Sequence, residues 1–415
     1  MGSKLITLIV IVLGVIAIAQ LVRVYELSSK LRKRGEHEIS TRDNNLNAKL
    51  MLFFMFLFYA GFIYLMATYG WTGRGESASV HGDGIDWLLN LNFIIIFTVF
   101  FLTNTLLFVF VYKYVRKAGV KAVYFSHSNK LEMIWTVIPA VVLAVIIILG
   151  LKQWNESTSY ADNEAIRIEL FSKQFDWTAR YAGVDNNLGR FDYKLTTDNN
   201  ELALMTTQTI DSAIFAMENG PTGIKALETK LNDRTLIFVP EDLEKMQNDL
   251  ARKSRLIRLL HQMKERHSAK IDASAWDDII QKDTLYLCVN KQYEFNFRAK
   301  DVIHSAHFPH FRAQMNTVPG LTTRFKFTPD ITTKQMREKK KDDKFQFVLL
   351  CNKICGGAHY KMKMIVVVLP QNEYKAWMKS KAKQTFRDKY FAVTAPSATA
   401  DTLAVGTDTA MVAVN

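Results

Sequence analysis

The sequence predicts an α-helical membrane region of four transmembrane helices, followed by an all-β domain with a partly helical insertion. Four apolar stretches are each long enough to cross a bilayer, at about residues 5–22, 50–69, 87–112 and 132–151. After Trp154 the chain turns polar, and short apolar, β-branched runs replace the long stretches, as is typical of strands. The length of 415 residues leaves room for two or three domains.

We expect the membrane region to cover residues 1–151 and the outer domain residues 152–394, with an insertion at about 195–283. Residues 395–415 are rich in Ala, Thr and Val without periodicity, and we expect them to be disordered. Within the outer domain, Ala165–Leu170 alternates like a strand. Pro240–Arg266 has a proline and acids in its first turn and basic residues later, which predicts a helix. Glu373–Tyr390 is predicted to form a closing helix.

The distribution of positive charge predicts how the membrane region is oriented. The net charge of +13 could suggest nucleic-acid binding, but much of the excess lies in segments 23–49 and 113–130, beside the apolar stretches. Cytoplasmic loops are enriched in Lys and Arg, so these two segments are predicted inside, and both termini and the outer domain outside. Ala17-Ile18-Ala19 resembles a signal-peptide cleavage site, but the basic segment that follows favours a retained span.

One short segment concentrates metal-binding side chains. It runs Cys351-Asn352-Lys353-Ile354-Cys355-Gly356-Gly357-Ala358-His359-Tyr360-Lys361-Met362, between the strand-like runs 345–350 and 364–369. Soft sulfur with imidazole is a ligand set that selects copper, and His304 upstream offers a second imidazole. With two cysteines, two copper ions could share two bridging thiolates. The cysteines could instead form a disulfide, or a Cys2His2 zinc site with the two histidines, but neither alternative uses Met362.

This loop, the run Asp301-Val302-Ile303-His304-Ser305 and Pro319-Gly320 resemble subunit II of the haem–copper cytochrome c oxidases. The run Asn129-Lys130-Leu131-Glu132-Met133-Ile134-Trp135-Thr136-Val137-Ile138-Pro139 is the second signature of that family. The resemblance covers roughly residues 129–181 and 284–377. It implies a cupredoxin-like Greek-key domain with a dinuclear copper centre, CuA. It implies these ligands: Cys351 and Cys355 bridging both coppers, His304 and Met362 completing one, and His359 with the Lys353 backbone carbonyl completing the other.

The resemblance also implies roles for residues outside the copper loop. Glu132 would lie at the entrance of a proton pathway, although a solvated carboxylate at a helix start is the simpler interpretation. Trp177 matches the second aromatic residue of the family's Gln-Trp-x-Trp run and is a candidate for electron uptake. Phe175 stands where the first Trp accepts electrons. Lys353 replaces the usual Glu that helps bind magnesium, so no magnesium is expected through this chain.

By resemblance, the chain would take electrons from cytochrome c and pass them to a separate haem-bearing catalytic subunit, which reduces oxygen to water and translocates protons. The expected location is the bacterial inner membrane, with the copper domain in the periplasm. The CuA subunit of a nitric oxide reductase, a quinol oxidase subunit and a membrane-anchored copper carrier are the alternatives. The first two spans would be additional, because the family normally has two.

Basic residues outnumber acidic ones between positions 301 and 396. Because complementary charge steers the encounter of redox proteins, this excess favours an acidic donor or a tethered cytochrome c domain. Contact with anionic lipid is the alternative explanation of the same charge.

Overall fold

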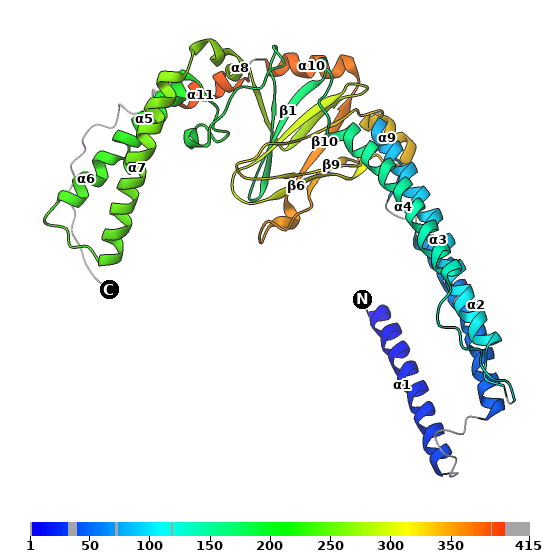
Figure 1. The fold of residues 1–415 in the computed structure, drawn as a ribbon. Helices are drawn as coiled ribbons and strands as arrows, with labels where there is room; N and C mark the ends of the chain where they lie inside the picture. Colours follow the sequence, from blue (N-terminus) through cyan, green and yellow to red (C-terminus); the bar gives the residue numbers. More distant parts are fainter. Residues whose placement is uncertain (1, 32–39, 71–73, 118, 383, 395–415) are drawn as a thin grey trace, which may run out of the picture. The chain divides into compact units, whose positions relative to one another are not determined.

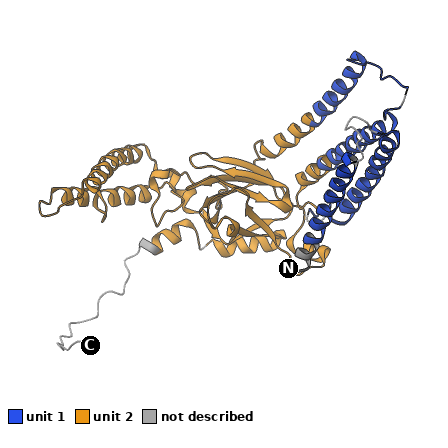
Figure 2. Ribbon diagram, turned by 90° about the horizontal axis from the view of Figure 1, so that it is seen from below, with its two compact units in different colours: residues 1–75, 89–146 blue, residues 76–88, 147–415 orange. Residues whose placement is uncertain are grey.

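The structure, a computed structural model, describes residues 2–31, 40–70, 74–117, 119–382 and 384–394. The tail predicted to be disordered, 395–415, lies outside the described residues. The chain divides into two compact units, one of residues 1–75 and 89–146, the other of residues 76–88 and 147–415 (Figure 2).

Four helices are long and apolar enough to cross a membrane, which confirms the membrane part of the predicted fold class. They are α1 (Gly2–Leu31), α2 (Thr41–Tyr69), α3 (Val80–Lys113) and α4 (Asn129–Thr158). Each helix extends beyond its apolar stretch, because polar residues at its ends continue the helical hydrogen bonding. Hydropathy marks only the apolar part of a helix and so could not predict these ends. Within the first unit, α2 packs on α3 through aromatic side chains, with the Phe62 and Phe100 rings stacked 5.0 Å apart.

The outer domain is a cupredoxin-like pair of five-stranded sheets, as predicted from the sequence (Figure 1). The first sheet has the order β3-β2-β1-β5-β8 and the second β4-β10-β9-β6-β7. The strands are β1 (Ile166–Lys173), β2 (Asp176–Tyr181), β3 (Ile279–Lys282), β4 (Thr284–Cys288), β5 (Tyr293–Ala299), β6 (His304–Phe308), β7 (Ala313–Thr317), β8 (Thr323–Phe327), β9 (Phe347–Cys351) and β10 (Lys363–Leu369). Two pairs are parallel, β1 with β5 and β10 with β4, and the others are antiparallel.

Alternating side chains of both sheets form one aromatic core. Along β5, Tyr293, Phe295 and Phe297 are buried, while the residues between them are partly exposed. Phe295 stacks on Phe327 at 4.9 Å and packs against Phe308 of the other sheet at 5.5 Å. Burial of this aromatic surface holds the sheets together. Cys288 is buried at the end of β4.

The insertion between β2 and β3 is partly helical, as predicted. It contains η1 (Tyr193–Leu195), α5 (Thr207–Asn219), α6 (Ile224–Asn232), α7 (Pro240–Arg266), η2 (Ala269–Ile271) and α8 (Asp272–Trp276). The helix predicted at Pro240–Arg266 has these bounds in the structure. Leu260 of α7 packs with Ile210 and Ile214 of α5 in a small apolar core of its own. The range expected for the insertion, 195–283, ends with β3, which pairs with β2 in the first sheet.

The single closing helix predicted at Glu373–Tyr390 is wrong, because the structure has two. They are α10 (Gln371–Lys381) and α11 (Phe386–Thr394). The break occurs because Thr385 and Asp388 exchange hydrogen bonds that start a new helix: the Asp388 N–H donates to the Thr385 hydroxyl at 3.4 Å, and the Thr385 N–H donates to the Asp388 carboxylate at 3.1 Å. The basic segment 330–344 contains a further short helix, α9 (Thr333–Lys340).

A buried ion network joins the first sheet to the insertion. The Glu169 carboxylate of β1 accepts hydrogen bonds from Arg180 of β2 at 2.5 Å and from Arg298 of β5 at 2.6 Å. Arg180 also binds the Asp278 carboxylate at 2.6 Å, directly before β3. Burial alone would raise the pKa of Glu169, but the two guanidinium groups lower it to about 2. Since the folded pKa is depressed, this stabilisation is present above about pH 4.5 and is lost as pH falls towards 2.

We predict that Glu169→Gln destabilises the outer domain strongly, because removing one partner of a buried ion pair leaves charges uncompensated, at a cost of about 3–5 kcal/mol. Thermal unfolding of the detergent-solubilised chain at neutral pH measures the effect. The matched control is Glu294→Gln, at a partly exposed position of β5 in the same sheet, which should change stability by less than about 0.5 kcal/mol. Equal effects of the two substitutions would contradict the prediction.

Candidate metal centre

Two paired strands close the loop that carries the predicted ligands. Lys363 of β10 pairs with Leu350 of β9, and the Cys351 N–H donates to the Met362 carbonyl at 3.1 Å. Inside the loop, η4 (His359–Lys361) forms a single tight turn. The strand pairing therefore fixes the two ends of the loop, and the short helical turn between them positions His359.

The predicted donor atoms lie close together. The sulfur atoms of Cys351 and Cys355 are 3.9 Å apart. His304 Nδ1 lies 3.9 Å and the Lys353 carbonyl oxygen 3.2 Å from the Cys351 sulfur. His359 Nδ1 lies 3.5 Å and the Met362 sulfur 3.9 Å from the Cys355 sulfur. The structure thus brings all six predicted ligands into one cluster. The predicted pairing of His304 with Met362, and of His359 with the Lys353 carbonyl, stays a prediction.

This cluster has six donors, more than one tetrahedral metal ion uses. Two sulfurs bound to one tetrahedral metal at about 2.3 Å are separated by roughly 3.8 Å, close to the separation in the structure. If two ions were bound, the two thiolates could be shared between them. The two imidazoles, the thioether and the carbonyl would be available as their further ligands. A single zinc ion would leave Met362 without a role, although its side chain is buried beside Cys355.

His304 is held by partners on both sides. It begins β6, which pairs with β9 so that Ala306 lies opposite Cys351, and this register brings the imidazole to the loop. Its Nε2 lies 2.9 Å from the Asp301 carboxylate, which leaves Nδ1 directed at Cys351. Partial burial would raise the pKa of Asp301, but hydrogen bonds from the Gln174 and Val302 N–H groups and from His304 lower it. A carboxylate behind a ligating imidazole fixes the ring and its tautomer.

The turn between β1 and β2 braces the loop from the other sheet. The Gln174 side-chain amide donates to the Cys355 carbonyl at 2.5 Å, and the Gln174 N–H donates to Asp301 at 2.7 Å. Gly356 has φ +136°, a region that favours glycine. A Cβ on Gly356 would lie 2.9 Å from both the Phe175 ring and the Gln174 amide. Gly356 therefore allows the turn to approach the loop closely.

The thiol of Cys355 is in a setting that disfavours a free thiolate. Burial, followed by the effects of Cys351 and Asp301, raises its pKa to about 11. A cysteine that binds a metal does so as a thiolate, with the cation in place of the proton. The charge of the site therefore fits a bound metal.

The other predicted site residues lie apart from the sulfur atoms. Trp177 is fully buried, and its ring lies 6.3 Å from the His304 ring, edge to face. Trp177 therefore cannot touch a donor protein directly, and its role in electron uptake stays a prediction. Glu132 is in the first turn of α4, where its carboxylate accepts the Ser128 N–H at 3.4 Å. This contact is what a helix-start carboxylate makes, and the proton-pathway role also stays a prediction.

Two supporting residues were not predicted from the sequence. Asp301 precedes His304 by three positions, and an acid so close to a candidate ligand was the available signal. Gln174 gave no local signal, because its partner is Cys355, 181 residues further along the chain.

The geometry defines a class: a protein with four helices long and apolar enough to cross a membrane and a β-sandwich that carries a sulfur- and imidazole-rich candidate metal site. A family model described as the transmembrane domain of cytochrome c oxidase subunit II matches residues 67–152. The match covers α3 and most of α4, whereas α1 and most of α2 lie outside it. That the first two helices are additions to the family's usual pair stays a prediction.

The chain is similar to proteins named as subunit 2 of cytochrome c oxidases. The alternative cytochrome c oxidase subunit 2 of Bradyrhizobium diazoefficiens is 25% identical over 296 residues, which are 71% of this chain and 79% of that protein. Cytochrome c oxidase subunit 2 of Thermostichus vulcanus is 32% identical over 102 residues, 24% of this chain and 27% of that protein. The periplasmic domain of subunit II (CoxB) of Bradyrhizobium japonicum is 15% identical, covering 55% of this chain and 99% of that structure, with a TM-score of 0.26. The chain is a relative of cytochrome c oxidase subunit II, and the resemblance seen in the sequence is confirmed.

We predict that Gly356→Ala reduces the metal content of the purified chain several-fold, since the new Cβ meets Phe175 and Gln174 at a positive φ. The matched control is Gly357→Ala, where a Cβ meets nothing within 4 Å. Elemental analysis of both variants, with circular dichroism to show that they fold, provides the measurement. Full metal content in Gly356→Ala would refute the proposed bracing of the loop.

Proposed function

We propose that this chain is the copper-bearing subunit II of a cytochrome c oxidase, which accepts electrons from a cytochrome c and passes them to a haem-bearing catalytic subunit. The observation that carries the proposal is the cluster of six donors, two thiolates, two imidazoles, a thioether and a carbonyl, around two sulfurs 3.9 Å apart. The comparisons support an oxidase component, because the matched relatives bear that name.

The proposed ligands are Cys351 and Cys355 as bridges, with His304, His359, Met362 and the Lys353 backbone carbonyl completing the site. A dinuclear copper centre bound in this way supplies one-electron transfer with little change in geometry. The protein's part is to hold the donors rigidly. Asp301 fixes the His304 ring, and Gln174 fixes the backbone at Cys355.

Burial favours a permanent centre over a metal carrier. His304 is fully buried, Met362 is 2% exposed and Cys355 is 5% exposed. A protein that exchanges its metal with a partner needs ligands that the partner can reach. These side chains leave little room for such exchange, so the site supports electron transfer rather than copper delivery.

Lys353 sets this chain apart from the resembled family. Its side chain is exposed, while its carbonyl faces Cys351. We propose that the carbonyl role in metal binding is retained, since any residue supplies one. The ammonium cannot act as an anionic oxygen ligand, so no magnesium ion is expected through this chain.

We propose that residues 1–151 cross the bacterial inner membrane and that residues 152–394 form the periplasmic copper domain. The basic segments between spans support this orientation, with both termini outside. The catalytic subunit and other oxidase subunits would pack on the apolar faces of α1 to α4, which are largely exposed in the isolated chain. Glu132 would then lie at the cytoplasmic side, at the entrance of a proton pathway in the catalytic subunit.

We predict two copper ions per chain, and that Met362→Leu retains copper while the reduction potential rises or falls measurably, because an axial thioether tunes a copper site more than it holds it. The measurement is elemental analysis, the optical spectrum and redox titration of the chain purified with its partners. The control is Met364→Leu, a buried methionine on β10, which should leave the potential unchanged. One zinc ion per chain would rule out the proposed function.

We predict that Glu132→Gln slows proton uptake by the assembled oxidase while reduction of the copper centre by the donor continues at the normal rate. The neutral amide cannot take up and release a proton. Glu156→Gln, at the opposite end of α4, is the matched control and should leave both rates unchanged. Time-resolved absorbance of the haems and of a pH dye separates the two steps. If both steps are normal in Glu132→Gln, the residue is only a helix-start carboxylate.

A further inference from the structure

A basic surface lies beside the candidate metal centre. Lys173, at the end of β1, forms an ion pair with Glu201 of the insertion. Lys282 and Lys300 lie 3.5 Å and 3.8 Å from the same carboxylate. Three ammonium groups thus face one carboxylate. We call Lys173, Lys282 and Lys300 the lysine rim.

Neighbouring side chains increase this positive charge. Lys389 of α11 donates to the Ile280 carbonyl of β3 at 2.6 Å. Its pKa is lowered by burial and then by the charges of Lys381 and Lys282. Two acidic side chains of the adjoining loops are already bonded: Asp301 accepts three hydrogen bonds, and Asp176 accepts the Trp177 N–H.

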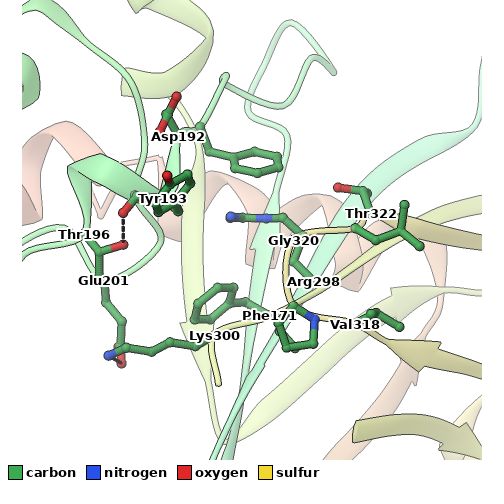
Figure 3. A pocket seen from close by; sticks show the side chains of 15 residues that line it. Phe171, Asp192, Tyr193, Thr196, Glu201, Arg298, Lys300, Val318, Gly320 and Thr322 are labelled. Atoms are coloured by element: carbon green, nitrogen blue, oxygen red, sulfur yellow. Dashed lines mark hydrogen bonds and ion pairs between the residues drawn. The ribbon is translucent and has the colours of Figure 1, made fainter. Parts of the chain in front are cut away.

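An apolar pocket of about 480 Å³ opens next to the lysine rim. Figure 3 shows Lys300 and Glu201 extending towards each other along one side of it. Phe171, Phe191, Val318, Pro319 and Leu321 supply apolar walls. The Arg298 guanidinium stacks on the Phe191 ring at 3.5 Å, but its charge is taken up by Glu169.

Exposed apolar side chains surround the mouth of the pocket. Leu321 is 59% exposed and Tyr193 73% exposed. An apolar centre with a charged margin is the usual composition of a surface that binds another protein.

Two lysines of this surface are adjacent in the sequence to residues that contact the candidate copper ligands. Lys300 directly precedes Asp301, whose carboxylate binds the His304 imidazole. Lys173 directly precedes Gln174, whose side chain binds the Cys355 carbonyl. A protein bound to Lys300 and Lys173 would therefore contact the residues next to Asp301 and Gln174, whose side chains hold the candidate ligands.

We propose that the lysine rim and its pocket are the docking surface for the electron donor, and that this donor is a cytochrome c, or a cytochrome c domain, with an acidic, partly apolar contact face. The inference rests on the proposed function. Complementary charge steers the encounter, and the pocket receives an apolar side chain of the donor. The insertion takes part directly, since it supplies Glu201, Tyr193 and Phe191 to this surface.

Anionic lipid is the other occupant that lysines suit. Two features favour a protein. Lys300 of the lysine rim lines a pocket with apolar walls rather than a flat basic face, and Lys300 and Lys173 directly precede the residues that support His304 and Cys355.

The test compares an acidic and a basic soluble cytochrome c, both added to the purified oxidase complex at several salt concentrations. Binding is measured by surface plasmon resonance, and electron uptake by stopped-flow absorbance. The acidic protein should bind and react faster, and its association rate should fall as salt rises. Lys282→Glu with Lys300→Glu should lower that rate about tenfold at low salt and little at high salt. Leu321→Ser should weaken binding at every salt concentration.

The matched control is Lys291→Glu, an exposed lysine that precedes β5 at the end opposite Lys300, which should leave all rates unchanged. Copper content and the optical spectrum, measured on every variant, show that the metal centre is intact.

Tighter binding of the basic cytochrome, weakening with salt, would overturn the proposal. The proposal would also be overturned if Lys282→Glu with Lys300→Glu left the association rate of the acidic cytochrome as high as Lys291→Glu does. The same holds if the double variant bound the cytochrome normally and lost only its binding to liposomes of anionic lipid. Absence of copper from the unchanged complex would instead refute the proposed function.

Discussion

The antiparallel pairing of β9 with β10 is the constraint on which the metal centre depends. It joins Cys351 to Met362 through the backbone and so fixes both ends of the loop that carries the sulfur ligands. β6 pairs with the same β9 and begins with His304. All candidate ligands therefore come from one sheet, whose hydrogen bonds set their spacing before any metal binds. Such a frame limits how far the ligands can move when the charge of the centre changes.

The first sheet supplies the supports of these ligands. Gln174 lies in the turn from β1 to β2, and Asp301 follows β5. Both strands belong to the first sheet, whereas the ligands they hold belong to the other. The aromatic core between the sheets, including the contact of Phe295 with Phe308, thus determines the distance between ligand and support. A change in the packing between the two sheets would therefore also change the geometry of the site.

The sequence predicted what depends on local spacing. Hydropathy located the four spans, and residue types at short intervals identified Cys351, Cys355, His359 and Met362. It did not predict contacts that depend on tertiary packing, such as Gln174 with Cys355, because the partners are far apart in the chain. The Glu169 network was missed for the same reason, since its arginines lie on two different neighbouring strands. The break between α10 and α11 was missed because the Thr385 and Asp388 cap lies inside an otherwise helical pattern.

The basic surface depends on the insertion, which supplies the carboxylate that its lysines contact. Without Glu201 the three ammonium groups of the lysine rim would face one another unopposed, so the carboxylate from the insertion is what allows them to gather. Partial burial would raise the pKa of Glu201, but hydrogen bonding to Lys173 and the charges of Lys173, Lys282 and Lys300 lower it. The carboxylate therefore stays ionised throughout the neutral range. Because salt screens the attraction between exposed charges, ionic strength controls how strongly this surface attracts a charged partner.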